Sequence, residues 1–597
     1  MKKIFTLLIL SVALTFAAKA ANATYAWFLA GGGTDADYPV KVTTDASGNI
    51  FFANKFRNAA AFNGINVTGS AKGSSSSYDY SLFICKLNPD KTNVWKLYSN
   101  AGGVEATSIA TTPAGDLIVT GTIKAVKGAA TATANIIDAA ETVTTFADLG
   151  TASADVQSFV AKFNSNGIIQ WAKELNSSAS KDTTVTTTAL ATDANGNVYL
   201  TGTFIKGVIL PGTNPVTLTS TNSSQATFIA KLNGLNGEVV WTKTTSGGIV
   251  SEKLSDLVYG DDGYLYTAGV FKNNATTPVD VTLDGKTFKP SVFASPALIK
   301  LNTDGTVSYV QIRENLSTAN DARVGCLTVK SGKAFIAGNF KGNAGGIKFA
   351  GDTIATTANY LNGYLAAFNA EDGSDLWQKS VISPAIIDVN GLAVGGDNNL
   401  YAFGGHYNGV GSVTPGDVDF GDGHTLTDAT NKYGDLYLAG YNPSNGTTQE
   451  VHLVAKGGAS ETAYSLTGFN DKLYLAAVEK SAPLTFENNT DTYSVTPSSY
   501  DFVLVKYTVQ TTPIAVCNQK DQAVFAYFNK ADRSVVINHA ENIVSAKVFG
   551  LDGRLVQSAV NQGEASDIRI YGINPGIYVI RTATVSGEAG LFKLIVF

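Results

Sequence analysis

Apolar and polar residues alternate along most of this chain in short runs, and tight turns separate the runs. The stretch TDANGNVYLTGTF (Thr192–Phe204) is typical, since an Asp/Asn/Gly turn leads directly into an alternating run. Strict alternation over four to eight residues predicts half-buried β-strands, and turns of this composition connect such strands as hairpins. The pattern therefore favours an all-β fold.

The same turn and strand recur seven times, about 70 residues apart. The copies are DASGNIFFA (from Asp45), PAGDLIVTG (Pro113), DANGNVYLTG (Asp193), DDGYLYTAG (Asp261), KSGKAFIAG (Lys330), GDNNLYAFG (Gly396) and FNDKLYLAA (Phe469). A third strand follows each copy, and six copies have a fourth. Most of these fourth strands carry an equivalent aromatic residue, namely Trp95, Trp171, Trp241, Tyr309 and Trp377.

The missing seventh outer strand lies at the front of the chain. TYAWFLAGGG (Thr24–Gly33) matches EVVWTKTTSGG (Glu238–Gly248), with Trp27 at the aromatic position. A first strand that completes the last unit leaves no sheet edge at the seam. We therefore expect an all-β, seven-bladed β-propeller with four-stranded blades, over residues 24–510. A linear solenoid is the alternative, but it does not explain the displaced strand.

Each repeat is longer than four short strands require. The surplus lies between the second and third strands, where six repeats contain another apolar run around a Gly, Asn or Asp turn, as in AAFNGINVTGSA. This pattern predicts a small extra hairpin on most blades. Because loops after the second and fourth strands share one face of a propeller, we expect that face to be enlarged.

Residues 1–23 have the pattern of a signal peptide. A basic start precedes the apolar run Ile4–Ala18, and small-residue cleavage sites end at Ala20 and Ala23. No later apolar run is long enough to span a membrane as a helix. Removing this segment changes the formal net charge from −6 to −9, and basic runs are absent, so nucleic acid is not an expected partner.

The chain has three cysteines, an odd number that argues against a disulfide framework in an exported protein. Cys85 and Cys326 fall within apolar strand patterns, which predicts buried thiols. Cys517 lies in the segment 511–522, which breaks the repeat and is expected to be a linker.

The repeat DANGNVYLTGTF, followed by TFIAKLNGLNGEVVWTKTTSGG, resembles the secreted seven-bladed propeller repeats of Bacteroidetes-type surface proteins. The resemblance implies fold and export, and it says little about activity because this fold has many functions.

Residues 523–597 have a different pattern of short alternating strands around LDGRLV and NPGIYVIR, which predicts a small β-sandwich domain. The segment resembles the type A C-terminal sorting domain of the type IX secretion system. The matching positions are Gly553, Arg554, Gly576, Tyr578, Lys593 and the final LIVF. The Pro-Asn-Pro-like turn that usually opens this domain is replaced by AYFNK. The resemblance implies passage across the outer membrane, removal of this domain, and release or attachment at the cell surface.

Six acidic residues stand eight or nine positions before the repeated turns: Asp37, Glu105, Glu252, Asp321, Asp388 and Glu461. They fall in loops expected near the mouth of the central channel. One interpretation is a ring of carboxylates that binds a cation or sugar hydroxyls. The other is that each carboxylate accepts backbone N–H bonds and stabilises its own blade.

No other constellation predicts a cofactor. DVDFGDGH (Asp417–His424) gathers three Asp, which calcium favours, but without EF-hand spacing. The four histidines lack zinc spacing, although His406 and His424 belong to one blade and could share a face. AEDGSDLWQ (Ala370–Gln378) weakly resembles the Trp-docking segment of quinoprotein propellers, for which docking of the Trp between blades is a sufficient explanation. Nucleophile elbows and phosphate loops are absent from the sequence.

The sequence thus favours an exported protein with a non-catalytic binding function, for glycan or protein, on the enlarged face. A secreted carbohydrate-active enzyme with carboxylates at the channel mouth is the alternative, and a structural surface-layer component is a third possibility. Two carboxyls of raised pKa in a deep cleft would favour the enzyme, and exposed aromatic residues on the face would favour binding.

Overall fold

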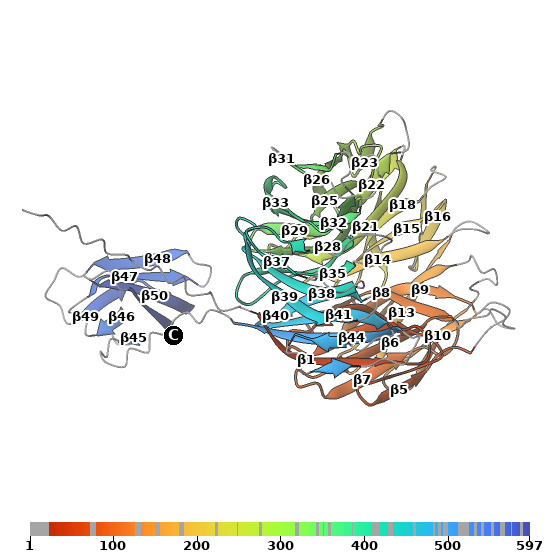
Figure 1. Cartoon of the computed structure of the whole chain (residues 1–597), viewed down its shortest axis with the longest axis horizontal. Helices are drawn as coiled ribbons and strands as arrows, with labels where there is room; N and C mark the ends of the chain where they lie inside the picture. Colours follow the sequence, from red (N-terminus) through yellow and green to blue (C-terminus); the bar gives the residue numbers. More distant parts are fainter. Residues whose placement is uncertain are drawn as a thin grey trace, which may run out of the picture. The chain divides into compact units, whose positions relative to one another are not determined.

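The protein is described from a computed structural model (Figure 1). The structure describes residues 23–596 except 72–78, 126–132, 148, 150–155, 178–183, 221–224, 248, 274–277, 317–321, 342–344, 350–351, 356–359, 385, 408–416, 428–433, 458–460, 481–483, 488–490, 494–499, 511–524, 530–533, 539–542, 551–553, 561–566, 575 and 585–588. These residues form β-strands and turns, with no helix among them. The chain divides into two compact units, Met1–Val509 and Gln510–Phe597.

The described part of the first unit contains seven four-stranded antiparallel arrangements, which we call blades one to seven. Their first strands are β2 (Tyr38–Thr44), β8 (Gly103–Thr111), β14 (Val185–Thr192), β21 (Ile249–Tyr259), β28 (Ala322–Lys330), β34 (Ile386–Val394) and β40 (Thr462–Phe469). Their second strands are β3 (Ile50–Phe56), β9 (Leu117–Lys124), β15 (Val198–Phe204), β22 (Leu265–Asn273), β29 (Lys333–Lys341), β35 (Leu400–Tyr407) and β41 (Lys472–Lys480).

The third strands are β6 (Ser81–Leu87), β12 (Gln157–Phe163), β18 (Ala226–Leu232), β25 (Ser295–Leu301), β32 (Leu361–Asn369), β38 (Gly434–Tyr441) and β44 (Tyr500–Val509). The outer strands are β7 (Asn93–Tyr98), β13 (Ile169–Ser177), β19 (Val239–Thr244), β26 (Val307–Ile312), β33 (Asp375–Val381), β39 (Thr448–Lys456) and, for blade seven, β1 (Ala23–Gly32). β1 pairs antiparallel with β44, from Ala23 opposite Val509 to Gly31 opposite Phe502, so strands from the two ends of this unit lie side by side (Figure 1).

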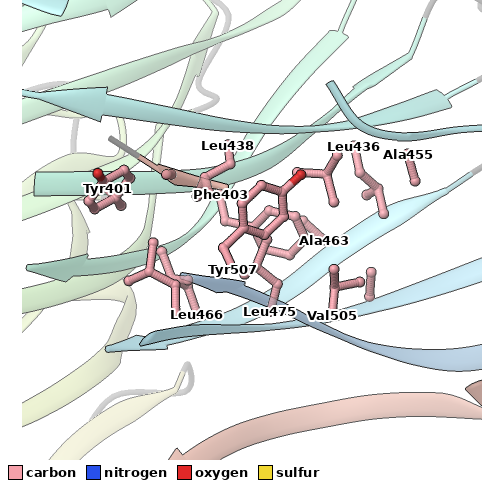
Figure 2. Close-up of a cluster of buried hydrophobic side chains, with 14 of the residues drawn as sticks. Tyr401, Phe403, Leu436, Leu438, Ala455, Ala463, Leu466, Leu475, Val505 and Tyr507 are labelled. Carbon is pink, nitrogen blue, oxygen red and sulfur yellow. The ribbon is translucent and has the colours of Figure 1, made fainter. Parts of the chain in front are cut away.

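The first strands contact one another in chain order, and β40 in turn contacts β2. Between neighbouring blades, the faces of the sheets pack as apolar cores. Figure 2 shows the core between blades six and seven, where Phe403, Leu438, Leu475 and Val505 are fully buried. The alternation read from the sequence explains this arrangement, because successive strand residues point to opposite faces and both faces of a blade are covered.

Each blade also contributes a hairpin between its second and third strands. The hairpins are β4–β5 (Ala59–Phe62, Ile65–Thr68), β10–β11 (Ala134–Ile137, Val143–Phe146), β16–β17 (Gly207–Leu210, Val216–Thr219), β23–β24 (Val281–Leu283, Lys286–Phe288), β30–β31 (Ile347–Phe349, Asp352–Ile354), β36–β37 (Val418–Asp419, Thr425–Leu426) and β42–β43 (Leu484–Phe486, Thr492–Tyr493). The turn residues suit them, since Asn63 and Gly64 in the first hairpin both have positive φ, as a type I′ turn requires.

These hairpins connect neighbouring blades. β4 pairs with β1, β10 with β7, β16 with β13 and β42 with β39, so each of these hairpins joins the outer strand of the preceding blade. The other three pair with the short extension that follows that outer strand: β20 (Ser246–Gly247), β27 (Glu314–Asn315) or Ile382. The sequence surplus therefore contributes backbone hydrogen bonds across each blade boundary.

The second unit consists of two antiparallel sheets. One contains β45 (Phe525–Asn529), β46 (Ser534–Asn538) and β49 (Asp567–Tyr571), and the other contains β48 (Leu555–Val560), β47 (Ile543–Gly550), β50 (Gly576–Thr584) and β51 (Ala589–Val596). Val535, Val548, Ile570 and Ile580 share one buried apolar core.

Candidate functional site

The six acidic residues do not occupy one equivalent position in the blades. Strand pairing shows that Glu105 and Asp388 lie at the same register, opposite Thr122 and Gly405, whereas Glu252 lies one residue earlier, opposite Phe271. A shift of one residue turns a side chain to the other face of the sheet. The set therefore divides between two faces.

The burial of the described acids agrees with this division. Asp37 and Glu461 immediately precede their first strands and are wholly buried. Glu105 is partly exposed and pairs with Lys55, 2.9 Å away, and Asp388 is partly exposed in β34. Asp321 and the side chain of Glu252 lie outside the described residues.

Asp37 makes structural contacts, and its pKa is shifted from the ordinary value. Its Oδ1 accepts a hydrogen bond from the Arg57 backbone N–H at 3.0 Å, and its own N–H donates to the Tyr500 carbonyl at 2.8 Å. Burial raises the pKa of Asp37 to about 8, despite the backbone donors that lower it. The backbone N–H of Asp37 therefore joins the start of β2 to blade seven, while its carboxyl joins it to the residue after β3 in blade one.

The repeated turn residues also have structural partners. Asp45 accepts the backbone N–H groups of Ser47 and Asn49, and Asp193 does the same for Asn195 and Asn197. Four third-strand lysines then join this turn to the next blade, because each Nζ pairs with a turn Asp and donates to a carbonyl of the following blade. The pairs are Lys86–Asp45, Lys162–Asp116, Lys231–Asp193 and Lys300–Asp262.

The outer-strand tryptophans make an interblade contact that we call the clasp. Trp171 Nε1 donates to the Gly234 carbonyl in the turn between the third and outer strands of the next blade, at 3.3 Å. In this turn Gly237 has positive φ, and a Cβ there would lie 2.8 Å from the Trp171 ring. Trp95, Trp241 and Trp377 donate to the corresponding turns of their following blades. Docking between blades thus accounts for the repeated Trp, including the one in the quinoprotein-like segment.

A cavity of about 300 Å³ lies where the first strands meet. Each first strand has a β-bulge at the same place, and the bulged residues all line the cavity: Val40, Thr107, Thr188, Ser255, Gly325, Asn390 and Tyr464. Lys41 of blade one and Asp256 of blade four form an ion pair across it at 3.3 Å. The pair joins opposite walls, and the described members of the acidic set do not line this cavity.

Four tyrosines gather where blades seven and one meet, and we call them the tyrosine patch: Tyr38, Tyr80, Tyr464 and Tyr500. The Tyr38 ring centroid lies 6.0 Å from that of Tyr80, 6.4 Å from that of Tyr464 and 5.1 Å from that of Tyr500. All four side chains are partly exposed. Because Tyr464 also lines the central cavity, the patch adjoins the cavity at the end of the blades where the hairpins and the starts of the first strands lie.

Cations and one predicted acid surround the tyrosine patch. Arg57 Cζ lies 4.0 Å from the Tyr80 ring centroid, and Lys480 Nζ lies 4.8 Å from that of Tyr500. Lys55 Nζ lies 4.6 Å from the Tyr80 centroid while it pairs with Glu105. Glu105 is therefore the member of the acidic set that the fold brings to this surface.

The hydroxyls of Tyr38 and Tyr464 in the patch remain protonated at neutral pH. Burial, followed by the neighbouring tyrosines, raises the pKa of Tyr464 to about 12 and that of Tyr38 well above its ordinary value. The patch thus offers apolar rings, hydroxyl donors, three partly exposed cations and a carboxylate. Sequence reasoning did not select these tyrosines, although three of the four adjoin an aspartate in the chain: Asp37–Tyr38, Asp79–Tyr80 and Tyr500–Asp501.

The remaining candidate ligands serve local structure. In the Asp417–His424 stretch, Asp419 accepts the Gly421 N–H, and Asp422 accepts the Thr448 N–H and pairs with Lys379. His406 is wholly buried beside Ser383. No group of three or more His, Cys, Asp or Glu residues with metal-binding geometry occurs among the described residues.

The cysteine prediction is confirmed for two residues. Cys85 and Cys326 are buried free thiols, and burial raises the pKa of both. Cys517 lies outside the described residues. The described part of the chain also contains no helix long and apolar enough to cross a membrane.

Comparison with solved structures finds propeller proteins. BamB from Moraxella catarrhalis is 12% identical, with 81% of this chain and 99% of that chain covered and a TM-score of 0.31. PorZ, a surface component of the type IX secretion system of Porphyromonas gingivalis, is 12% identical, with 95% and 100% covered and a TM-score of 0.18. The Hadza microbial sialidase Hz136 is 9% identical, with 82% and 94% covered and a TM-score of 0.32.

No family model and no curated protein sequence matches the chain. The structural likeness therefore concerns an all-β, propeller-like fold, and at these TM-scores it carries no conclusion about activity.

Proposed function

We propose that this chain is an exported, closed seven-bladed β-propeller that binds glycan without catalysis. Two contacts support ring closure: β1 pairs with β44, and β40 contacts β2 as the other first strands contact their neighbours. Full closure leaves no unpaired sheet edge at the seam, which suits an extracellular protein. The signal-peptide pattern of residues 1–23 supports export.

The tyrosine patch is the observation that carries the binding proposal. Tyrosine provides a large, rigid contact surface at low conformational entropy cost, with an apolar ring and a hydroxyl donor. Sugar rings present C–H faces that stack on tyrosine rings. At the rim of the patch, Lys480 and Arg57 are placed to bond with hydroxyl or acidic substituents of a glycan, and Glu105 with hydroxyl groups. The patch combines aromatic anchors with a polar edge, as binding surfaces do.

Two carboxyls with raised pKa values favour the enzyme alternative, but a substrate could not reach either of them. Burial raises the pKa of Glu479 to about 9, and that of Asp37 to about 8. Both side chains are wholly buried, and neither lines the central cavity. General acid–base catalysis needs the carboxyl within hydrogen-bond reach of a substrate. Burial at the seam therefore favours a structural role for these two groups.

We further propose that the second unit is a type IX sorting domain that is removed after export. Its two-sheet architecture and the positions of Gly576 and Tyr578 on β50 and of Lys593 on β51 are compatible with the resemblance. Arg554 directly precedes β48, and Gly553 lies outside the described residues. Recognition by the secretion machinery would deliver the propeller to the cell surface or the medium.

A glycan-array assay on the purified mature chain tests the binding proposal. We expect binding without cleavage, and we expect Tyr500→Ala to weaken it at least about tenfold, as losing one stacked ring does. Tyr264→Ala is the matched control, since Tyr264 also stacks with a lysine (Lys300 Nζ at 3.9 Å from the ring centroid) but lies at the turn end of a blade. Its affinity should not change.

Three results would contradict parts of this proposal. Cleaved glycans would establish an enzyme. An equal loss of glycan affinity in Tyr500→Ala and Tyr264→Ala would mean that the glycan binds elsewhere. Absence of glycan binding would leave protein recognition or a surface-layer role. The same array with a calcium chelator tests whether calcium is involved, which the acidic set first suggested.

A further inference from the structure

The clasp is replaced at one blade boundary. The clasp Trp lies opposite the lysine of the third strand, as Trp171 lies opposite Lys162. At the same register in blade six, Glu450 lies opposite Gly440. Glu450 is almost fully buried, at 7% exposure. A carboxylate thus occupies the place that a large aromatic residue fills elsewhere.

The partner of the clasp is also missing at this boundary. In other blades the Trp donates to the turn that joins the third and outer strands of the next blade. Blade seven has no such turn, because its third strand β44 ends at Val509 and its outer strand β1 begins at Ala23, opposite Val509. The backbone N–H of Ala23 donates to Glu450 Oε2 at 3.1 Å. Glu450 therefore contacts the start of β1.

Further polar groups orient the Glu450 carboxylate. Tyr401 donates to its Oε1 at 2.8 Å, and His452 Nε2 lies 3.1 Å from its Oε2. His452 Nδ1 lies 2.8 Å from Glu487 Oε1, and the Tyr507 hydroxyl donates to Glu487 Oε2. Two carboxylates thus surround one imidazole. Tyr401 and Tyr507 also lie in the apolar core shown in Figure 2, which anchors this network in the boundary between blades six and seven.

We propose that Glu450 is a receptor for a primary ammonium group, namely the new amino terminus created when the signal peptide is removed. The two predicted cleavage sites place that amine on Ala21 or Thr24, at most two residues from the Ala23 nitrogen. Two residues of chain span at most about 7 Å, so either amine falls within electrostatic reach of the carboxylate.

The charge state of the network supports this assignment. Burial alone would raise the pKa of Glu450, but hydrogen bonds from His452, Tyr401 and Ala23 outweigh it, and its pKa lies below the ordinary value. Burial would lower the pKa of His452, but Glu450 and Glu487 raise it to about 9. Glu450 is therefore ionised at neutral pH, and a further positive charge beside it is favourable. Processing would then strengthen the seam of the ring.

The pKa of the α-amino group tests the proposal directly. The mature chain is labelled with an amine-acylating reagent across a pH series, and mass spectrometry of the N-terminal peptide gives both the start residue and the amine pKa. We expect a start at Ala21 or Thr24 and a pKa of about 9, above the ordinary value of about 7.7–8.0. The Glu450→Gln chain should return it to the ordinary value.

Two further variants separate charge from folding. Glu450→Asp keeps the charge but shortens the side chain, so it should give an intermediate pKa. Glu238→Gln is the matched control, because Glu238 pairs with Lys173 just before an outer strand in another blade, and it should leave the amine pKa unchanged. An ordinary amine pKa in the unaltered chain, or the same raised value in all four chains, would overturn the proposal.

Discussion

The boundaries inside the repeat and those at the seam are built from different chemistry. From blade one to blade six, a clasp aromatic residue of one blade docks on the turn of the next, usually with a lysine beside it. At the boundary between blades six and seven, Glu450 takes the place of the clasp aromatic residue, with His452 beside it. The difference follows from the chain path. A turn offers carbonyl groups to a Trp donor, whereas the start of β1 offers the Ala23 N–H, which the Glu450 carboxylate accepts.

The second strands show the same contrast. At one register near the end of these strands, the buried residue is apolar in five blades: Phe56, Ile123, Phe204, Phe271 and Phe340. The equivalent residues are His406 in blade six and Glu479 in blade seven, and both are wholly buried. Glu479 lies opposite Asp501, and a Cβ on Gly32 of β1 would lie 2.2 Å from Asp501 Oδ1. Buried acids are therefore concentrated beside β1, the strand on which the proposed ring closure depends.

The largest expected effect comes from removing that strand. Deleting residues 1–33 leaves β44 and β4 without their shared neighbour, and exposes two sheet edges and the apolar cores on both sides. We expect the chain to aggregate or to lose its cooperative unfolding transition, measured by size-exclusion chromatography and calorimetry. A chain that begins at Ala21 is the control. A soluble deletion chain with an unchanged transition would show that β1 does not hold the structure together.

A clasp inside the repeat should matter less than the closing strand. Trp171→Ala removes a buried ring and its hydrogen bond, so we expect the free energy of unfolding to fall by about 3–5 kcal/mol. Trp171→Phe retains most of the ring and should cost about 1–2 kcal/mol. Denaturant unfolding measures both. Equal losses in the two variants would mean that the hydrogen bond to Gly234, rather than the packing, stabilises the boundary.

The repeat could be predicted from sequence because its signals are local. Turn positions follow from Asn, Asp and Gly, and pairs such as Asn63–Gly64 and Asp284–Gly285 adopt the expected positive φ. The strands follow from alternation, and the spacing of the Trp residues marks the period. Even so, the hairpin β10–β11 of blade two was not expected, and neither was the pairing of each hairpin with the preceding blade, since partner choice depends on contacts distant in sequence.

The candidate site was harder to predict, for a physical reason. Counting eight or nine residues back from a turn can misplace a residue by one position along its strand. A shift of one position turns the side chain to the other face of the sheet. Glu105 and Asp37 were therefore grouped together although one is partly exposed and the other is buried. The tyrosine patch combines residues from two blades, so no local pattern marks it. Glu450 is visible in the sequence only as the absence of a Trp in the sixth outer strand.

A gradual effect that we predict is a pH dependence of stability beside β1. The pKa of Glu479 is raised to about 9 by burial and then by Asp501, from an ordinary value near 4.5. The folded state thus binds a proton that the unfolded state has released, and stability is lost as pH rises from about 4.5 through 9. The loss is at most about 1.4 kcal/mol for each pH unit. We expect the denaturant concentration at the midpoint of unfolding to decrease as the pH is raised from 6 to 9.

Glu479→Gln isolates this contribution, because the amide cannot release a proton in either state. His452, whose raised pKa also makes stability fall between about pH 6.5 and 9, is unchanged in this variant, so its contribution cancels in the comparison. The Glu479→Gln chain should lose less stability over this range than the unaltered chain, while Glu238→Gln should follow the unaltered chain. Parallel curves for all three chains would mean that Glu479 is ionised in the folded state, which its burial opposite Asp501 makes unfavourable unless a cation occupies the seam.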